Sequence, residues 1–540
     1  MSSPAEHDAA STTGEIFPYS SVFIDADRSD FAAAIRLCYS SLSSSSGVDS
    51  ELRLRQALCR SIESRFTCSG SPRNRNSNPA LVCLSVRSGL DLFLGSMAPF
   101  PRDSELLMSP VNIPGMVEIV RAHGLTPVPL DAPLETLAPT AEQAARLVND
   151  RTVGVLLAHL FGRRLRIKQD LEPFLMLAEE RGLFLIEDCA ECFHGFEEGE
   201  GEEEEAGLLG DPRSDCVLFS FGVIKPVTCF GGAVAKVRDV QVLNRMRQRQ
   251  ESQEYATQTA AAYLGKVVKY LVLSPCLGSP ALMRAGMRIT RTLRVDHKRL
   301  MVEMLRGFPS DRELLLRGIR QRPSTPLLAF MHLRLCGNTA PSAFSSQELS
   351  PSDDADTSTQ QLTSLMNIDA EEGIEGEDSR QLEYLRFQGE RKDEAETIAA
   401  HTSSLKRGFS ESKKKGDFAL RLLSAVSPNL IAIPGCPTAT LAITGNYWLF
   451  PIVVREADEV VRVLNGWGVD AYSQASQLAL VDGGERTPLA ADWMRRCVFL
   501  PIHKHVPFRL IDRMCSLVRA AVEQTAAAAA ESVRNVKAKL

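Results

Sequence analysis

The sequence lacks the features that mark nucleic-acid-binding and membrane-spanning proteins. Its 61 basic residues are outnumbered by 67 acidic residues, and the formal net charge of −6 gives no reason to expect nucleic acid as a partner, because proteins that bind nucleic acid usually present a basic face. No apolar run is long enough to cross a bilayer. The nearest candidate, Val267 to Met283, is interrupted by Lys269, Pro275 and Pro280. We therefore expect neither nucleic-acid binding nor a membrane span.

Neither a secretory signal nor a disulfide framework is expected. The N-terminal stretch "MSSPAEHDAASTTGE" has no basic start followed by an apolar core. The 13 cysteines are odd in number and scattered through 540 residues, which is typical of reduced thiols in the cytoplasm. Cys189 and Cys192 form a C-x-x-C pair, but no second pair with zinc spacing follows it. We therefore expect a cytoplasmic protein with no metal site and no redox role for this pair.

What the sequence does contain is an alternation of strand-like and helix-like segments. Hydrophobic residues make up 44% and charged residues 24% of the chain, which is ordinary for a soluble globular protein. Between Ala80 and Val237, apolar runs such as "ALVCLS", "VGVLLAHL", "LFLIED" and "CVLFSF" alternate with amphipathic stretches such as "GMVEIVRAHG" and "LEPFLMLAEERG". This pattern predicts an α/β fold with a mostly parallel central sheet flanked by helices.

Composition divides the chain into four parts. Residues 1–50 are polar and include the serine-rich "SSLSSSSG", so we expect a disordered or spacer N-terminus. Residues 51–335 should form a large α/β domain, in which "EEGEGEEEE", residues 197–205, is a solvated acidic loop. Residues 341–412 are expected to be an acidic low-complexity insertion. In residues 413–540, "NYWLFPIVV" and "ADEVVRVLNGWGVDAYS" predict a smaller α+β C-terminal domain.

Chemically useful side chains follow several of the predicted strands. Asp188 follows the apolar run "LFLIE", Ser220 lies near the end of "CVLFSF", and Ser88 with Gly89 follows "ALVCLSVR" and opens a helical stretch. Lys225 stands inside an apolar run just before two glycines, which is an unusual place for a lysine. Because ligands collect at the carboxyl ends of strands in open α/β sheets, we consider these groups candidates for one site.

The same groups are those that pyridoxal 5'-phosphate (PLP) requires. Its aldehyde needs an amine, its pyridine nitrogen needs a buried carboxylate, and its phosphate needs amide and hydroxyl donors, best arranged at a helix N-terminus. Lys225 and Asp188 supply the first two, and Ser88, Gly89 and Ser220 supply the third. Composition and spacing by themselves establish only an α/β protein with a candidate ligand site.

Four segments carry a resemblance to a known family. "IEDCAECFHGF" and "GDPRSDCVLFSFGVIKPVTCFGGAVAKV" resemble the core of the DegT/DnrJ/EryC1/StrS aminotransferase family of fold-type-I PLP enzymes. "SVRSGLDLFL" resembles that family's Ser-Gly-Thr phosphate turn, and "YWLFPIVV" resembles part of its C-terminal domain. The resemblance covers roughly residues 80–237 and about residue 446 to the end. It implies the large domain of a fold-type-I PLP transferase and a homodimer, since family sites are built at a subunit interface.

The resemblance also implies a role for each matching residue. Lys225 would form the Schiff base and shuttle protons, Asp188 would partner the pyridine nitrogen, and Ser220 together with Ser88 and Gly89 would bind the phosphate. The implied activity is PLP-dependent transfer of an amino group from an amino acid to a keto-sugar, such as a nucleotide-linked sugar, or to a related keto substrate.

The chain departs from the family's pattern at several places near the cofactor. Leu90 stands where the family usually has a phosphate-binding threonine, and Glu191 replaces the glutamine beside the cofactor's phenolic oxygen. Ile113 occupies the place of the aromatic residue that stacks on the ring. Arg320 or Arg322 is the candidate substitute for an asparagine that a neighbouring subunit usually lends. Glu191 and Ile113 are therefore included among the cofactor-binding candidates.

The alternative function is a catalytically altered PLP-binding protein, or a regulatory protein of the same fold with residues 341–412 as its interaction segment. A PLP dehydratase would have the lysine replaced, and Lys225 argues against that. His159 ends a predicted strand, where a histidine is more often a satisfied core residue. His503 and His505 in "PIHKH" are expected to lie in a loop.

Overall fold

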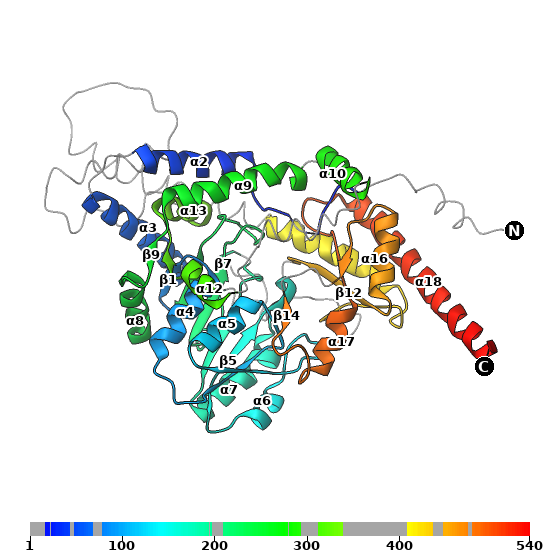
Figure 1. Ribbon diagram of the computed structural model, residues 1–540, viewed down its shortest axis with the longest axis horizontal. Coiled ribbons are helices and arrows are strands. Elements are labelled where there is room, and N and C mark those ends of the chain that lie inside the picture. The colour runs from blue at the N-terminus through cyan, green and yellow to red at the C-terminus, as the bar shows by residue number, and fades with distance from the viewer. Residues whose placement is uncertain are drawn as a thin grey trace, which may run out of the picture.

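The computed structural model describes a large α/β unit and a smaller α+β unit beside it (Figure 1). It covers residues 17–21, 23–43, 48–68, 78–193, 195–196, 209–278, 280–292, 311–337, 408–435, 447–473 and 478–539. The acidic loop expected at residues 197–205 lies outside these ranges, as do residues 341–407 of the expected insertion.

A seven-stranded sheet forms the centre of the large unit. In chain order its strands are β1 (Ala80–Cys83), β2 (Glu105–Met108), β4 (Thr126–Pro129), β5 (Thr152–Ala158), β6 (Phe184–Asp188), β7 (Cys216–Ser220) and β8 (Ala233–Val237). Their order across the sheet is β1-β8-β7-β6-β5-β2-β4. All neighbouring strands are parallel except β8, which runs antiparallel to both β7 and β1. The carboxyl ends of the six other strands therefore meet at one edge.

Helices cover both faces of this sheet, as the apolar runs of its strands require. One face packs against α4 (Val86–Met97), α5 (Pro114–Ala122) and α8 (Val240–Glu251). The opposite face packs against α6 (Ala141–Leu147) and α7 (Glu172–Arg181) near β5, and against α3 (Val48–Cys68) and α13 (Thr325–Cys336) near β1. Side chains of β5 alternate between the two cores, with Leu156 on the first face and Val155 and Leu157 on the second.

Further helices, two helical turns and two short strands connect and extend this framework. The helices are α9 (Ala260–Gly278), α10 (Pro280–Thr292) and α12 (Arg312–Ile319), with a 3-10 turn at Leu160–Gly162 and a π-helical turn at Ile167–Leu171. The short strands β9 (Ala256–Thr257) and β10 (Gln321–Arg322) pair in parallel. Among the residues that the structure describes, no helix combines the length and apolar character needed to cross a membrane.

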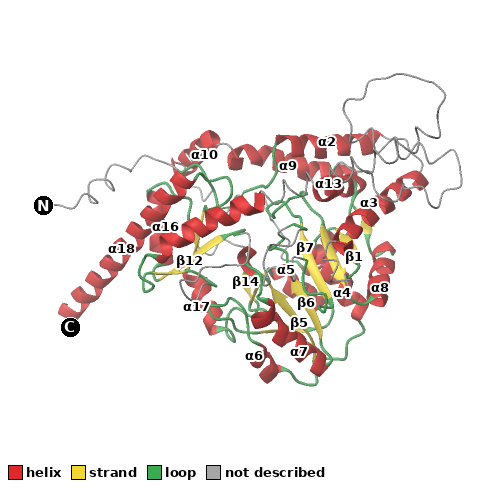
Figure 2. Cartoon of the chain, turned by 180° about the vertical axis from the view of Figure 1, so that it is seen from behind, coloured by secondary structure: helices red, strands yellow, loops and turns green. Residues whose placement is uncertain are grey.

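Residues 28–43 form the helix α2 (Arg28–Ser43), which corrects the expectation of a disordered or spacer segment over residues 1–50. Apolar side chains at helical spacing, Phe31, Ala34 and Leu37, are buried in the main core. Phe31 stacks on Phe230 with ring centroids 4.7 Å apart. The polar composition of the segment concealed this stripe. In both views, α2 runs alongside α9 (Figures 1 and 2).

The smaller unit is built on a four-stranded antiparallel sheet of order β11-β12-β15-β13. Its strands are β11 (Ile431–Ala432), β12 (Phe450–Val454), β13 (Tyr472–Ser473) and β15 (Cys497–Leu500). Helices α16 (Ala457–Gly466), α17 (Pro488–Arg496) and α18 (Phe508–Lys539) accompany it, with a further helix over residues 408–424. Residues 408–412 thus belong to a helix of this unit rather than to the low-complexity insertion in which we placed them.

A two-stranded ladder joins the two units close to the site. Strand β14 (Ala479–Leu480), from the C-terminal part of the chain, pairs antiparallel with β3 (Val111–Asn112), which follows β2 of the large sheet. Because β3 leads directly into α5, this pairing fixes the position of the loop that contains Ile113.

The docking of α2 can be tested by removing the Phe31 ring. The side chain is only 2% exposed and stacks on Phe230, so Phe31→Ala should lower the free energy of unfolding by roughly 3 kcal/mol or more. Urea titration monitored by circular dichroism measures this. Tyr39→Ala, on the same helix but 62% exposed, should change it little. Equal stabilities of the two variants would contradict the packing described here.

Candidate active site

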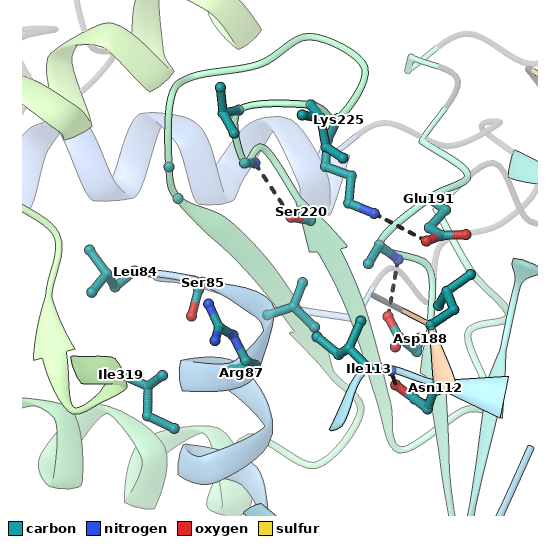
Figure 3. A pocket seen from close by; sticks show the side chains of 18 of the residues that line it. Leu84, Ser85, Arg87, Asn112, Ile113, Asp188, Glu191, Ser220, Lys225 and Ile319 are labelled. Atoms are coloured by element: carbon teal, nitrogen blue, oxygen red, sulfur yellow. Dashed lines mark hydrogen bonds and ion pairs between the residues drawn. The ribbon is translucent and has the colours of Figure 1, made fainter. Parts of the chain in front are cut away.

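A cavity of about 410 Å³ opens at the carboxyl edge of the large sheet, beyond the ends of β1, β5, β6 and β7. Five of the seven residues predicted as site residues line it, namely Lys225, Asp188, Ser220, Glu191 and Ile113. Figure 3 shows them converging from different elements of the fold. This is the location at which open α/β sheets usually bind ligands.

Lys225 lies in the loop that connects β7 with β8, and its side chain is 13% exposed. Its Nζ atom lies 3.3 Å from Glu191 Oε1 and 3.8 Å from the centre of the Trp448 ring. Trp448 is fixed in turn, because its indole N–H donates to the carbonyl of Ile224 at 2.6 Å. A carboxylate and an aromatic face both stabilise an ammonium ion. The unusual lysine is therefore a nearly buried cation held by two partners and pointing into a cavity.

Asp188 is the last residue of β6 and is 9% exposed. Burial raises the pKa of its carboxyl to about 6, and the neighbouring Glu191 acts in the same direction. The N–H of Ala190, which donates to Asp188 Oδ1 at 3.1 Å, and the charge of Lys225 lower the pKa in part. Such a buried carboxyl at a strand end is suited to hold a cationic nitrogen of a ligand.

The turn at the start of α4 differs from the sequence prediction. We expected Ser88 and Gly89 at the cavity, but neither lines it. The helix begins three residues earlier than that assignment required, because Ser85 is its N-cap and accepts a hydrogen bond from the Ser88 N–H at 3.2 Å. Ser85, Val86 and Arg87 are the turn residues that face the cavity.

Ser88 and Gly89 have structural roles instead. The Ser88 hydroxyl is buried and donates to the carbonyl of Ile319 at 2.7 Å. A Cβ atom on Gly89 would lie only 3.0 Å from the Leu218 side chain, so the glycine allows α4 to pack closely on the sheet. Leu90, where the family usually has threonine, is fully buried and does not line the cavity either. Its replacement of threonine therefore leaves the cavity wall unchanged.

Positive charge gathers around this turn. Arg87 shares the cavity wall with Lys266 and Lys269, which both project from α9. Burial, together with the charges of Arg87 and Lys269, lowers the pKa of Lys266. Within the described part of the chain, neither lysine has a carboxylate within ion-pair distance. The amino end of α4 adds the partial positive charge of a helix N-terminus. This side of the cavity is arranged to receive an anion.

The remaining two predicted residues, Glu191 and Ile113, complete the wall near the amine. Glu191 Oε2 accepts a hydrogen bond from the N–H of Phe161 at 2.8 Å, while Oε1 faces Lys225. Its negative charge is therefore compensated, although it stands where the family has a neutral glutamine. Ile113 is the N-cap of α5 and presents an aliphatic side chain to the cavity (Figure 3).

The arginines proposed as substitutes for a neighbouring subunit's asparagine do not line the cavity. Arg320 is engaged in ion pairs with Asp91 at 3.0 Å and Glu254 at 2.6 Å, and Arg322 lies in the β9–β10 ladder. His159 does line the cavity, although we gave it no direct role, and its Nε2 lies 3.2 Å from Glu187 Oε2. Trp448 and Arg87 are the site residues that sequence reasoning missed.

The raised pKa of Asp188 predicts a pH-dependent stability in the cofactor-free protein. The folded-state pKa of about 6 lies above the ordinary value of 3.8, so the ionised carboxylate costs stability above pH 6, and this cost disappears as the pH falls toward 4. Asp188→Asn should therefore be more stable than the wild type at pH 7.5, by on the order of 2–3 kcal/mol.

Denaturant titrations across the pH range measure this difference, which should shrink steadily between pH 6 and pH 4. Asp103→Asn is the matched control, because Asp103 is exposed and its positive φ of 60° suits asparagine equally well. A pH-independent difference in stability, or an Asp188→Asn protein that is less stable than the wild type at pH 7.5, would show that burial does not set the pKa of the Asp188 carboxyl.

Comparison with characterised proteins locates the family match over the same part of the chain. Residues 77–279 match the DegT/DnrJ/EryC1/StrS aminotransferase family. A GDP-perosamine synthase of Caulobacter vibrioides is 29% identical over 173 residues, which cover 31% of this chain and 42% of that protein. A GDP-perosamine synthase of Escherichia coli O157:H7 is 27% identical over 141 residues, 26% of this chain and 35% of that protein. The chain thus matches less than half the length of these curated relatives.

Solved structures extend the likeness to the fold of nearly the whole chain. The aminotransferase TlmJ of Streptoalloteichus hindustanus superposes with a TM-score of 0.53 at 16% identity, covering 94% of this chain and 99% of that one. DesI, solved in the presence of its TDP-sugar product, gives a TM-score of 0.53 at 15% identity, covering 96% and 98%. These likenesses confirm the predicted fold class, a mostly parallel sheet with a smaller α+β domain. Over residues 77–279, the chain is similar to the DegT/DnrJ/EryC1/StrS aminotransferase family.

Proposed function

We propose that the protein is a PLP-dependent aminotransferase that moves an amino group from an amino acid to a keto-sugar or a related keto substrate. The observation that carries the proposal is the placement of Lys225 and Asp188. The carboxyl closes β6, the amine follows the adjacent strand β7, and both face one cavity. The family match over residues 77–279 and the similarity to a GDP-perosamine synthase support the same substrate class.

The residues of the cavity fit the cofactor group by group. Lys225 would hold its aldehyde carbon, and Asp188 would hold its pyridine nitrogen in the protonated form. Ser85, Arg87 and Ser220 would bind its phosphate, assisted by the N-terminus of α4. When bound, PLP supplies an electron sink that stabilises negative charge on the substrate carbon.

Proton transfer is the task of the chain's own side chains. The Lys225 amine, once released from the cofactor, is positioned to carry a proton within the cavity. Glu191, 3.3 Å away, would accept the proton that the ammonium must lose before it can act as a nucleophile. The Trp448 ring limits where the amine can move. Asp188 must remain a carboxylate to keep the pyridine nitrogen charged.

Two lysines of α9 bear on which keto substrate the site can accept. Lys266 and Lys269 stand beside Arg87 on the cavity wall, and their positive charge favours a keto substrate that is itself anionic, as nucleotide-linked sugars are. We further propose that the protein acts in the cytoplasm as a homodimer, because the reduced cysteines suit that compartment and family sites are built between two subunits.

Amino-group transfer is tested by adding PLP to the purified protein and titrating it with a panel of amino acids. A productive donor should shift the absorption of the bound cofactor, and a keto-sugar nucleotide should reverse the shift. Lys225→Arg keeps the positive charge beside Glu191 but should abolish both changes, whereas Lys269→Arg should retain them. Cofactor binding without a response to any donor would favour the alternative, a catalytically altered PLP-binding protein.

The phosphate assignment predicts a selective effect of Arg87→Ala. Removing a charged hydrogen-bond donor should weaken PLP binding by about tenfold to a hundredfold, while pyridoxal, which lacks the phosphate, should bind as it does to the wild type. Fluorescence titration of both ligands measures the two affinities. Arg102→Ala, on the exposed surface, should leave both unchanged. An equal loss for pyridoxal would place Arg87 elsewhere in the site.

A further inference from the structure

A buried cluster of two cysteines and a histidine lies directly behind the cavity wall. The sulfur atoms of Cys189 and Cys192 and a ring nitrogen of His159 all lie within 4.8 Å of one another. Both cysteines are only 2% exposed. We expected no use of this C-x-x-C pair because no second pair follows it in the sequence. The third group, His159, instead directly follows the neighbouring strand β5 and lies 30 residues before Cys189 in the sequence.

The backbone between the two cysteines forms a turn that brings them close together. The N–H of Cys192 donates to the carbonyl of Cys189 at 3.3 Å, which closes a turn directly after β6. The first and last residues of such a turn lie less than about 7 Å apart at Cα. Disulfide-bonded cysteines are separated by roughly 4.4–6.8 Å at Cα. The Cα separation of the pair therefore falls in the range of a disulfide, and the two sulfur atoms already lie within 4.8 Å of each other.

The surroundings of Cys192 favour its thiolate. As a thiol it donates weakly to the Cys189 carbonyl at 3.8 Å. Burial by itself would raise the pKa of the Cys192 thiol, but hydrogen bonds from the Cys189 thiol and the His159 imidazole lower it. Burial and the neighbouring Cys192, in contrast, raise the pKa of Cys189. The pair thus combines a nucleophilic sulfur with a protonated partner, which is the arrangement of reactive C-x-x-C motifs.

The hydrogen bonds of His159 argue against a metal ion at this place. The Leu165 N–H donates to His159 Nδ1 at 3.1 Å, so Nδ1 carries a lone pair and Nε2 carries the proton. Nε2 faces Glu187 Oε2 at 3.2 Å. A neutral imidazole in this tautomer has no second lone pair to offer a metal. It can only donate a proton to a neighbouring acceptor.

We propose that Cys189 and Cys192 are a redox-active dithiol that a small peroxide oxidises to a disulfide. The Cys192 thiolate attacks one oxygen of hydrogen peroxide, the O–O bond breaks, and the departing hydroxide takes up a proton to leave as water. The Cys189 sulfur then attacks the resulting sulfenic acid of Cys192, and its proton and the hydroxyl leave as a second water. Two thiols are oxidised and one peroxide is reduced to two waters.

Closure of the disulfide would act on the site, because the same turn holds two of its carboxyl groups. The Ala190 N–H, between the cysteines, donates to Asp188, and Glu191 contacts both Lys225 and the Phe161 N–H. Ala190, Glu191 and His159 also line the cavity, so the two cysteines lie next to residues of its wall. This consequence rests on the proposed function, whereas the disulfide itself does not.

Peptide mapping tests the dithiol without any cofactor. Trypsin releases residues 182–213 as one peptide that contains Cys189 and Cys192 and no other cysteine. After limited peroxide treatment of the full-length protein and alkylation, this peptide should carry no alkyl group and should have lost two hydrogens. Reduction should restore it. Cys59, which is less buried, should still be alkylated at the same peroxide dose.

Two results would overturn the dithiol. One is a pair that stays reduced after Cys59 is oxidised, and the other is a pair that becomes alkylatable only after a chelator removes bound zinc. The Cys189→Ser protein should accumulate a dimedone adduct on Cys192, because the resolving thiol is gone, and absence of this adduct would contradict the roles assigned. Mapping of the wild type needs no variant to fold.

The effect on the site has a separate readout. Oxidised wild-type protein should bind PLP at least tenfold more weakly than reduced protein, with recovery after reduction, while Cys59→Ser should behave as wild type. A disulfide that forms without changing PLP affinity would contradict the coupling. If neither form binds PLP, the proposed function fails while the peptide result still decides the dithiol.

Discussion

The nearly buried ammonium group of Lys225 is the constraint around which the site is organised. A cation removed from water is costly unless opposite charge or aromatic faces replace the lost hydration. Glu191, from the turn after β6, and Trp448, from the segment leading into β12, provide that replacement. Because Trp448 also donates to the Ile224 carbonyl, the lysine loop and the C-terminal unit are held together at the amine. The site is therefore a junction between the two units.

The sheet topology explains why acid and amine can meet at all. Strands β6 and β7 are parallel neighbours, so the residues that follow them emerge side by side at one edge. Strand β1 ends at the same edge, which brings the start of α4 and its anion-attracting N-terminus to the opposite side of the cavity. The burial that raises the pKa of Asp188 is a consequence of this placement, since the strand lies inside the sheet. The sheet topology therefore accounts both for the meeting of Lys225 and Asp188 and for the raised pKa of Asp188.

The sequence predicted the sheet and the residues at its strand ends, because apolar runs of strand length are visible without a structure. It could not place the turn before α4, since "SVRS" offers two serines and only backbone geometry selects Ser85 as the N-cap. It missed Trp448 for a related reason, because this residue reaches its partners through long-range contacts. The helix α2 was hidden by its many serines. The local sequence pattern predicts which segments form helices and strands. Contacts between residues that are distant in the sequence depend on the whole fold and are not visible in that pattern.

The central claim is that Lys225 and no other lysine meets the cofactor's aldehyde. The most direct measurement is borohydride reduction of the PLP-treated protein, followed by mass-spectrometric mapping of the pyridoxyl group. The account predicts a single modified position, Lys225, with a yield that falls in the Asp188→Ala protein. A pyridoxyl group spread over surface lysines, or confined to Lys266 or Lys269 on the opposite wall, would contradict it.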